Sequence, residues 1–174
     1  MTALQNHTLV LGGASSGKSA LAEARVLRTD ALAIYVATAQ AFDDEMSDKI
    51  ARHRARRGAE WATVEEPLAL ADAIGGAPRD LPVLVDCVTL WLTNLLLADA
   101  DVAAAENAFV AALANRHAPV TIVSNEVGYG IVPMDALSRR FRAAQGALNQ
   151  RLAAECGTVL MVVAGLPLAI KGTA

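Results

Sequence analysis

Residues 12–19 have the types and the spacing that polyphosphate binding requires. They read Gly-Gly-Ala-Ser-Ser-Gly-Lys-Ser after a short apolar run, which is the G-x-x-x-x-G-K-S pattern of a phosphate-binding P-loop. Its glycines let successive backbone N–H groups curl around phosphates. Lys18 would add a positive charge, and Ser19 a hydroxyl ligand for Mg²⁺. We predict a catalytic role for Lys18 and nucleotide contacts from Gly12, Gly13, Ala14, Ser15, Ser16, Gly17, Lys18 and Ser19.

The residues that follow the loop support this interpretation. Residues 20–25 read Ala-Leu-Ala-Glu-Ala-Arg, a good helix-forming sequence. The N-terminus of such a helix directs unpaired amides and partial positive charge toward bound phosphates. A strand before the loop and a helix after it argue against a chance glycine-rich turn.

Asp86 is the second candidate, because it ends the apolar run Leu84-Val85-Asp86. A P-loop enzyme requires a carboxylate that shares Mg²⁺ with the loop hydroxyl, so we predict that Asp86 and Ser19 hold the metal. The alternative is that Asp86 caps the helix expected from Val88. Ligands of open α/β sheets bind beyond the carboxyl ends of the strands, where Thr38 also lies. Asn125 and Glu126 end another strand, and either substrate binding or loop ordering would explain them.

Residues 43–58 predict a helix with acids in its first turn, bases in its last and a terminal glycine, an order that the helix dipole favours. His53 shares one face with Met46 and Ile50, so spacing alone favours a structural histidine over a catalytic one. The neighbouring arginines would suit a second phosphate group or, with weaker support, a nucleic acid. Glu65 and Glu66 precede Pro67 and could serve only to cap the next helix.

Apolar strand-like runs alternate with helical ones, which predicts one α/β domain over residues 1–174 with a largely parallel sheet. The expected strands are Thr8–Leu11, Leu32–Thr38, Pro82–Cys87, Val120–Ser124 and Thr158–Ala164. The expected helices are Lys18–Leu27, Asp43–Arg57, Pro67–Ile74, Val88–Leu97, Val102–Arg116 and Met134–Glu155.

Composition narrows the class of protein further. With 54% hydrophobic and 19% charged residues, the chain is expected to be a compact globule and not a disordered chain. Its apolar runs are too short to span a bilayer and no secretory signal is visible, so we expect a cytoplasmic protein without stable membrane insertion. A net charge of −3 gives no general reason to expect a nucleic acid partner. Cys87 and Cys156 adjoin apolar runs and are expected to be buried free thiols.

An ordered series of motifs resembles the bifunctional adenosylcobinamide kinase/adenosylcobinamide-phosphate guanylyltransferases of cobalamin biosynthesis. The series covers nearly the whole chain and is far more specific than a P-loop alone. Its motifs occur at Gly12–Ser19, Tyr35–Thr38, Asp43–Met46, Ile50–His53, Trp61–Glu65, Thr93–Leu96, Asn125–Pro133 and Asn149–Ala153. Two positions depart from the family pattern: Ser15 stands where the family usually has Arg, and Arg52 where some members have a second histidine.

The resemblance implies a P-loop NTPase-like (RecA-like) fold, a mostly parallel sheet flanked by helices, and two activities. The family phosphorylates adenosylcobinamide with ATP or GTP, and Mg²⁺ is the implied cofactor. It then transfers GMP from GTP through a guanylylated histidine, giving adenosyl-GDP-cobinamide and pyrophosphate. The resemblance assigns the nucleophile to His53 and also implies a homo-oligomer, possibly trimeric. Beyond the P-loop, the implied nucleotide-binding residues are Ala37, Thr38, Ala39, Arg54, Glu65 and Asp86.

Two other functions remain open from the sequence. A simpler P-loop kinase would phosphorylate a small molecule without forming a bond between protein and nucleotide. A nucleotide-driven switch would hydrolyse nucleotide without a corrinoid acceptor and respond to a macromolecular partner; the sequence has no broad basic segment that favours it.

Overall fold

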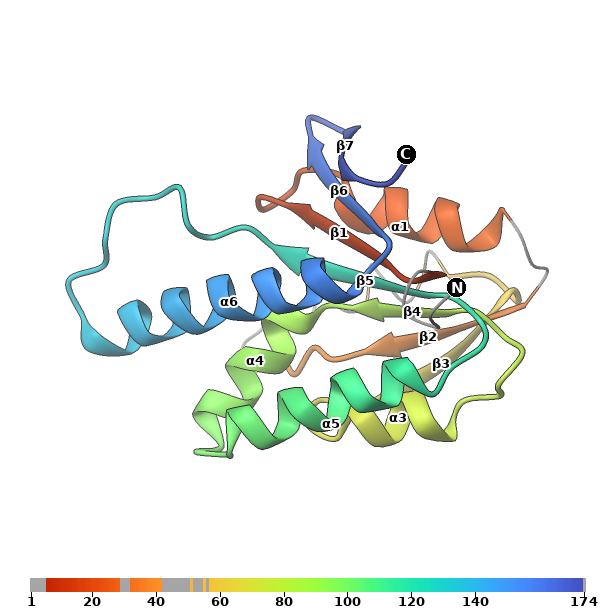
Figure 1. Ribbon diagram of the computed structural model, residues 1–174, viewed down its shortest axis with the longest axis horizontal. Coiled ribbons are helices and arrows are strands. Elements are labelled where there is room, and N and C mark those ends of the chain that lie inside the picture. Colours follow the sequence, from red (N-terminus) through yellow and green to blue (C-terminus); the bar gives the residue numbers. More distant parts are fainter. Residues whose placement is uncertain (1–5, 29–31, 42–50, 52–54, 56, 174) are drawn as a thin grey trace.

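The computed structural model describes residues 6–28, 32–41, 51, 55 and 57–173. These residues form a seven-stranded sheet in the order β3-β2-β4-β5-β1-β6-β7, parallel except for the antiparallel pair of β6 and β7 (Figure 1). The strands are β1 Thr8–Gly12, β2 Ala33–Ala37, β3 Trp61–Glu65, β4 Val83–Asp86, β5 Val120–Asn125, β6 Thr158–Val163 and β7 Leu166–Lys171. The helices are α1 Lys18–Leu27, α3 Leu70–Gly76, α4 Val88–Leu97, α5 Val102–Ala114 and α6 Ala136–Glu155. The mostly parallel α/β architecture is therefore confirmed.

All five expected strands are present, and α1 and α4 have their expected bounds. Two strands were missed. β3 lies where we expected the chain to lead into a helix, and its alternating polar sequence leaves it largely exposed at the sheet edge. β7 is also exposed throughout and has a proline as its second residue, a residue tolerated mainly at sheet edges. Neither strand has the continuous apolar character of the buried strands.

The other described helices differ from expectation at both starts and ends: α3 ends at Gly76 and not Ile74, α5 ends at Ala114 and not Arg116, and α6 begins at Ala136 and not Met134. The helix expected from Pro67 begins at Leu70, because Glu66 first accepts hydrogen bonds from the N–H groups of Leu68 and Ala69. Glu66 therefore orders the turn before α3, but it does not cap the helix, because the N-cap is Ala69 and no side chain forms a cap hydrogen bond there. Apart from residues 51, 55 and 57, the expected helix Asp43–Arg57 lies outside the described residues, and so do His53 and Arg54.

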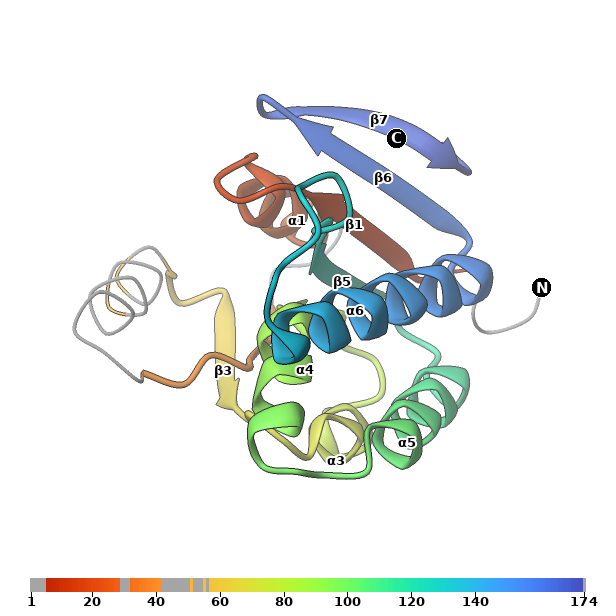
Figure 2. The same cartoon turned by 90° about the vertical axis from the view of Figure 1, so that its left-hand side faces the viewer.

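Two apolar clusters hold the layers together. Helices α3, α4, α5 and α6 cover one face of the sheet, where Trp91, Phe109 and Leu148 are buried. Helix α1 covers the other face and buries Ala22 and Val26 (Figure 2). Since β1, β4 and β5 lie between these layers, the carboxyl ends of the central strands have a rigid support.

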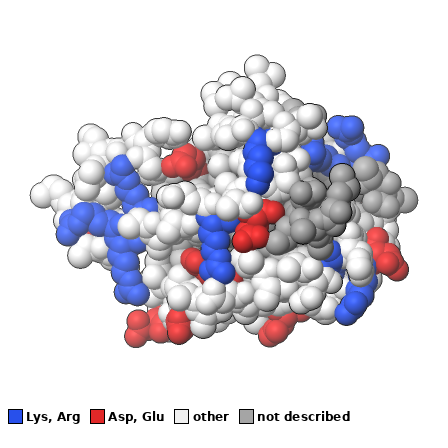
Figure 3. Space-filling view, in the orientation of Figure 1, with Lys and Arg blue, Asp and Glu red and all other residues white. Residues whose placement is uncertain are grey.

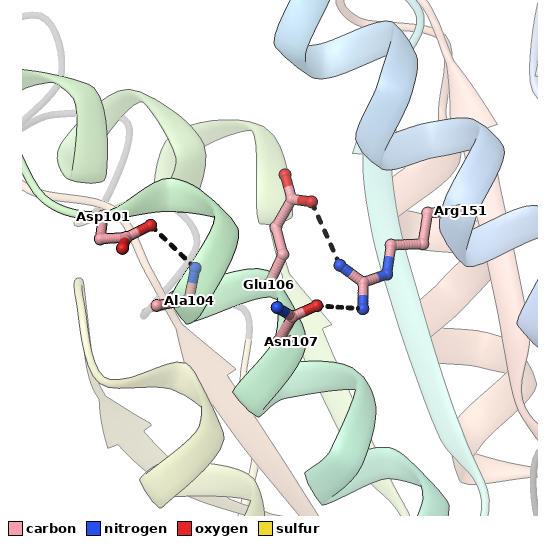
Figure 4. A network of polar contacts seen from close by, with 5 residues as sticks. All are labelled: Asp101, Ala104, Glu106, Asn107 and Arg151. Atoms are coloured by element: carbon pink, nitrogen blue, oxygen red, sulfur yellow. Dashed lines mark hydrogen bonds and ion pairs between the residues drawn. The ribbon is translucent and has the colours of Figure 1, made fainter.

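Polar contacts join α5 to α6 on the outside of this packing. Arg151 of α6 donates to Asn107 at 2.7 Å and pairs with Glu106 at 3.5 Å, while Asp101 accepts from the N–H of Ala104 to cap α5 (Figure 4). The cap satisfies one of the free N–H groups of the first turn.

Cys87 and Cys156 are free and buried, as expected. Burial raises the pKa of the Cys87 thiol to about 11 and that of Cys156 to about 12. Both therefore stay protonated and unreactive near neutral pH. Among the described residues, no helix has the length and apolar content needed to cross a membrane.

Arg116 is expected to be the most important polar residue for stability. It is 3% exposed and donates to the carbonyl oxygens of Ile74, Ala77, Pro78 and Leu81 at 2.7–3.1 Å. Arg116→Ala leaves these buried carbonyl oxygens without a hydrogen-bond donor. The substitution should lower the free energy of unfolding by about 4 kcal/mol, measured by urea denaturation. The exposed Arg140→Ala is the control, expected within about 0.5 kcal/mol of wild type; equal losses would contradict the assignment.

His7 should make stability depend on pH. It is fully buried; Nδ1 accepts from the N–H of Val120 and Nε2 bonds the carbonyl of Leu113, both at 3.0 Å. These partners require a neutral ring, and burial lowers the pKa of His7 below its usual 6.5. Between the two pKa values the unfolded chain binds more protons, so this contribution to stability is complete above about pH 6.5 and is lost as the pH falls.

We therefore expect that lowering the pH from 7.5 to 5.5 reduces the contribution of His7 to the free energy of unfolding by about 1 kcal/mol. The measurement compares urea denaturation at both values for wild type and His7→Gln, which should show the smaller pH dependence. His117 is exposed, and His117→Gln should retain the wild-type dependence. Identical pH dependence in wild type and His7→Gln would refute the assignment.

Candidate functional site

The turn between β1 and α1 has the backbone form that phosphate binding requires. Gly17 is the N-cap of α1 and has φ 91°, a value that favours glycine. A Cβ at Gly12 would lie 2.8 Å from the carbonyl oxygen of Val162, so a side chain there would collide with β6. The requirement for glycine predicted from the sequence is thus explained at both positions.

The remaining loop residues complete the turn. Lys18 Nζ donates to the Gly13 carbonyl at 3.1 Å, which holds the ammonium across the loop. Ser15 has φ 55°, and its side chain is exposed. Ser16 has a buried Oγ without a hydrogen-bond partner in the described chain. Its carbonyl accepts from the N–H of Gly165 at 2.8 Å, so the β6–β7 turn supports the P-loop.

Asp86 lies beside the P-loop serine, as the sequence predicted. Its Oδ1 accepts from Ser19 Oγ at 3.4 Å and its Oδ2 from Tyr35 Oη at 2.5 Å. Burial, followed by the Asp86 charge, raises the pKa of Tyr35, so this phenol remains a donor. A carboxylate and a hydroxyl side by side suit Mg²⁺, which takes few protein ligands and completes its shell with water and phosphate. These two residues therefore fit the implied metal.

The alternative role for Asp86 is wrong. The N-cap of α4 is Cys87, and no side chain forms a cap hydrogen bond there. Asp86 instead directs both carboxylate oxygens toward the P-loop side of the sheet, where Ser19 and Tyr35 lie.

Two other candidates, Glu65 and Ala37, form a row with Asp86 across neighbouring strands. Ala37 is in register with Glu65 of β3 on one side and with Asp86 of β4 on the other. Thr38 follows, but its buried hydroxyl donates to the Cys87 carbonyl at 2.7 Å and accepts from the Cys87 N–H at 2.9 Å. Its side chain therefore anchors the end of β4, while Ala37 and Ala39 remain partly exposed.

A hollow of about 340 Å³ lies at the outer end of this row. The Arg57 guanidinium lies 3.6 Å above the Tyr35 ring and donates to Thr63 at 3.3 Å. Trp61 packs edge-on against Tyr35 at 5.4 Å. The lining residues are Arg57, Gly58, Trp61, Thr63 and Glu65. Among these lining residues, the sequence predicted binding roles for Glu65 and for the arginines near His53, which include Arg57; the alternation of residues 61, 63 and 65 would have placed Trp61 and Thr63 on the same strand face as Glu65.

At the end of β5, the two candidates Asn125 and Glu126 have different roles. Glu126 orders the loop: its carboxylate accepts from the N–H of Gly128 at 2.6 Å and its own N–H donates to the Gly12 carbonyl at 3.1 Å. The backbone N–H of Asn125 donates to Thr89 and its carbonyl accepts from Asn149. Its side-chain Oδ1, however, is buried without a hydrogen-bond partner in the described chain.

A buried polar network, which the sequence did not reveal, supports this strand end. Ser124 donates to Asn149 Oδ1 at 2.6 Å, and Gln145 Nε2 donates to both at 3.0 Å. Gln145 and Asn149 are four residues apart on α6, a spacing that places them on one helix face.

Comparison with known proteins agrees with this geometry. Residues 8–170 match the family described as cobinamide kinase / cobinamide phosphate guanyltransferase. The chain is 48% identical to the bifunctional adenosylcobalamin biosynthesis protein CobP of Pseudomonas aeruginosa, covering 94% of this chain and 96% of the relative. It is 42% identical to the protein CobU of Salmonella typhimurium, named in the same way, covering 94% and 98%.

Solved structures of a recombinase and of an ATPase have a fold similar to that of this chain. The RadB recombinase superimposes with a TM-score of 0.54 at 19% identity, covering 90% of this chain and 74% of that one. An ATPase of a bacterial type III secretion system gives a TM-score of 0.59 at 9% identity, covering 95% and 57%. At such identities the likeness concerns the fold alone.

Proposed function

Because the chain belongs to the cobinamide kinase/cobinamide phosphate guanyltransferase family, we propose that it phosphorylates adenosylcobinamide with ATP or GTP and then transfers GMP from GTP to the product. The second step gives adenosyl-GDP-cobinamide and pyrophosphate. The observation that carries the proposal is the P-loop with Ser19 and Asp86 in contact beside it, within a family match over residues 8–170.

In the kinase step, the hydroxyl oxygen of cobinamide attacks the γ-phosphorus and the bond to the β-phosphate oxygen breaks. Lys18 at the start of α1 and the loop N–H groups stabilise the charge on the transferred phosphoryl group. Ser19 and Asp86 would hold Mg²⁺, which supplies neutralising charge on the β- and γ-phosphates when bound. Tyr35 holds the Asp86 carboxylate in place by its hydrogen bond.

In the transferase step, a neutral His53 imidazole attacks the α-phosphorus of GTP and pyrophosphate leaves. A phosphate oxygen of cobinamide phosphate then attacks the same phosphorus, and the imidazole is released. The hollow beside Tyr35 suits the guanine base: the Glu65 carboxylate matches its N–H donors, and Trp61 offers an aromatic surface. Arg57 would contribute positive charge near the phosphates.

The test is to incubate the full chain with adenosylcobinamide and ATP, then with GTP, and to identify the corrinoid products by mass spectrometry. Phosphorylation followed by GMP addition is expected. Acid-labile, base-stable GMP on the protein distinguishes this route from a kinase without a covalent intermediate. Nucleotide hydrolysis that leaves the corrinoid unchanged would refute the proposal and favour a switch.

We also propose that the protein is a homo-oligomer, with a homotrimer as the form suggested by the resemblance. The β6–β7 hairpin supports self-association, because Val163, Leu166, Leu168 and Ile170 are each more than half exposed along the sheet edge (Figure 2). Large exposed apolar patches mark protein contacts. Analytical ultracentrifugation tests it, and a monomer at micromolar concentration would refute it.

A further inference from the structure

We propose that the carboxyl end of β5 and the loop after it, residues 126–135, form the site for the phosphoryl acceptor. Asn125 receives the acceptor hydroxyl, and the apolar side chains of the loop support the corrin ring. The inference rests on the proposed function, since it names the site that the corrinoid occupies.

The sheet places Asn125 between the two known parts of the phosphate site. β5 lies between β4, which ends in Asp86, and β1, which leads into the P-loop. Asn125 is in register with Gly12, whereas Asp86 is in register with Val123. Asn125 therefore extends two residues beyond the row of Asp86, on the side where ligands of such sheets bind.

The side-chain oxygen of Asn125 lacks a hydrogen-bond donor among the described residues. Its Oδ1 is buried without a hydrogen-bond partner, and a buried acceptor of this kind is costly unless a ligand or water supplies a donor. The backbone is fixed, because its N–H donates to Thr89 Oγ1 at 2.7 Å and its carbonyl accepts from Asn149 at 3.0 Å. A bound hydroxyl would supply the missing donor to an acceptor whose backbone is fixed.

The loop that follows exposes large apolar side chains beside the same site. Tyr129 is 87%, Ile131 96% and Met134 97% exposed. The loop starts next to the P-loop, where the Glu126 N–H donates to the Gly12 carbonyl, and both segments leave the sheet at the carboxyl ends of β1 and β5 (Figure 1). Exposed apolar groups beside a ligand site mark a surface that binding covers.

Basic side chains hold this loop from α6. Figure 3 shows Lys and Arg gathered at the end of the molecule where α6 begins. Two residues of this part of α6 bind the loop backbone: Arg139 donates to the carbonyls of Pro133 and Met134, and Arg142 to that of Gly128. The apolar side chains are thus presented on an anchored backbone.

A corrinoid acceptor matches both the unpaired oxygen of Asn125 and the exposed apolar side chains of the loop. A corrinoid is a broad macrocycle with methyl groups on its faces, suited to apolar contact, and its aminopropanol arm ends in a hydroxyl. Asn125 Oδ1 accepts the hydroxyl hydrogen and directs an oxygen lone pair to the γ-phosphorus. As the new O–P bond forms and the β–γ bridging bond breaks, the proton passes to a phosphate oxygen and then to water. Asn125 orients the nucleophile and takes no proton.

The first test compares Asn125→Ala with wild type in the kinase assay. We expect kcat for cobinamide phosphorylation to fall about 10²-fold, with the dissociation constant for a non-hydrolysable nucleotide and the melting temperature unchanged. An unchanged kcat, or a loss explained entirely by weaker nucleotide binding or unfolding, would overturn this role.

The second test concerns the loop. Ile131→Ser/Met134→Ser should raise the KM for cobinamide at least about ten-fold with little change in kcat, whereas Leu97→Ser, at the exposed end of α4, should leave it unchanged. A KM of the double variant that equals the wild-type value would overturn the proposal. If the sedimentation of the double variant has also changed, the loop is instead an interface between copies of the chain. If wild type itself fails to phosphorylate cobinamide, the proposed function fails instead.

Discussion

His53→Ala is expected to abolish GMP transfer while leaving cobinamide phosphorylation within a few-fold of wild type. The imidazole would form the N–P bond that carries GMP, and removal of a catalytic nucleophile costs about 10⁴-fold or more in rate. The kinase step passes directly from nucleotide to hydroxyl, so it does not require the imidazole. The expectation rests on the Ile-x-x-His motif at residues 50–53.

The measurement uses GTP labelled at the α-phosphate and follows protein-bound label and both corrinoid products. His117 is exposed, and His117→Ala provides a matched control that should label normally. Label that persists on His53→Ala would identify another nucleophile. Loss of both activities would instead show that the substitution disrupts the nucleotide site.

The sequence predicted the central fold well because the buried strands carry their own signal. β1, β4 and β5 have apolar side chains on both faces, as parallel strands between helical layers require. The edge strands lack this signal. Exposure at the sheet edge permits the mixed polarity of β3 and Pro167 in β7, so only pairing with a neighbour makes these segments strands.

The candidate site shows the same division between local and tertiary information. Glycines, a lysine and a serine at fixed spacing identified the P-loop, and a carboxylate after an apolar strand identified Asp86. Tyr35 could not be recognised as the partner of Asp86, because that contact joins positions 51 residues apart. The different roles of Asn125 and Glu126 depend likewise on Thr89, Asn149 and Gly12, which only the folded chain brings together.

Lys18→Ala should impair both steps, in contrast to His53→Ala. Lys18 is the first residue of α1, and its ammonium reaches back over the loop to Gly13, where a polyphosphate would replace that carbonyl as its partner. The charge would stabilise the transferred γ-phosphoryl group in the kinase step and the leaving pyrophosphate in the transferase step.

We expect kcat/KM for cobinamide phosphorylation to fall about 10³-fold in Lys18→Ala, with GMP labelling reduced as well and the melting temperature retained. Lys171, which donates to carbonyls at the end of α6, provides a lysine control: Lys171→Ala should keep both activities even if it lowers stability slightly. Phosphorylation within ten-fold of wild type in Lys18→Ala would mean that the loop N–H groups and the metal suffice to neutralise the phosphates. Loss of phosphorylation with normal labelling would place the two reactions at separate nucleotide sites, because one loop lysine serving both steps requires both rates to fall together.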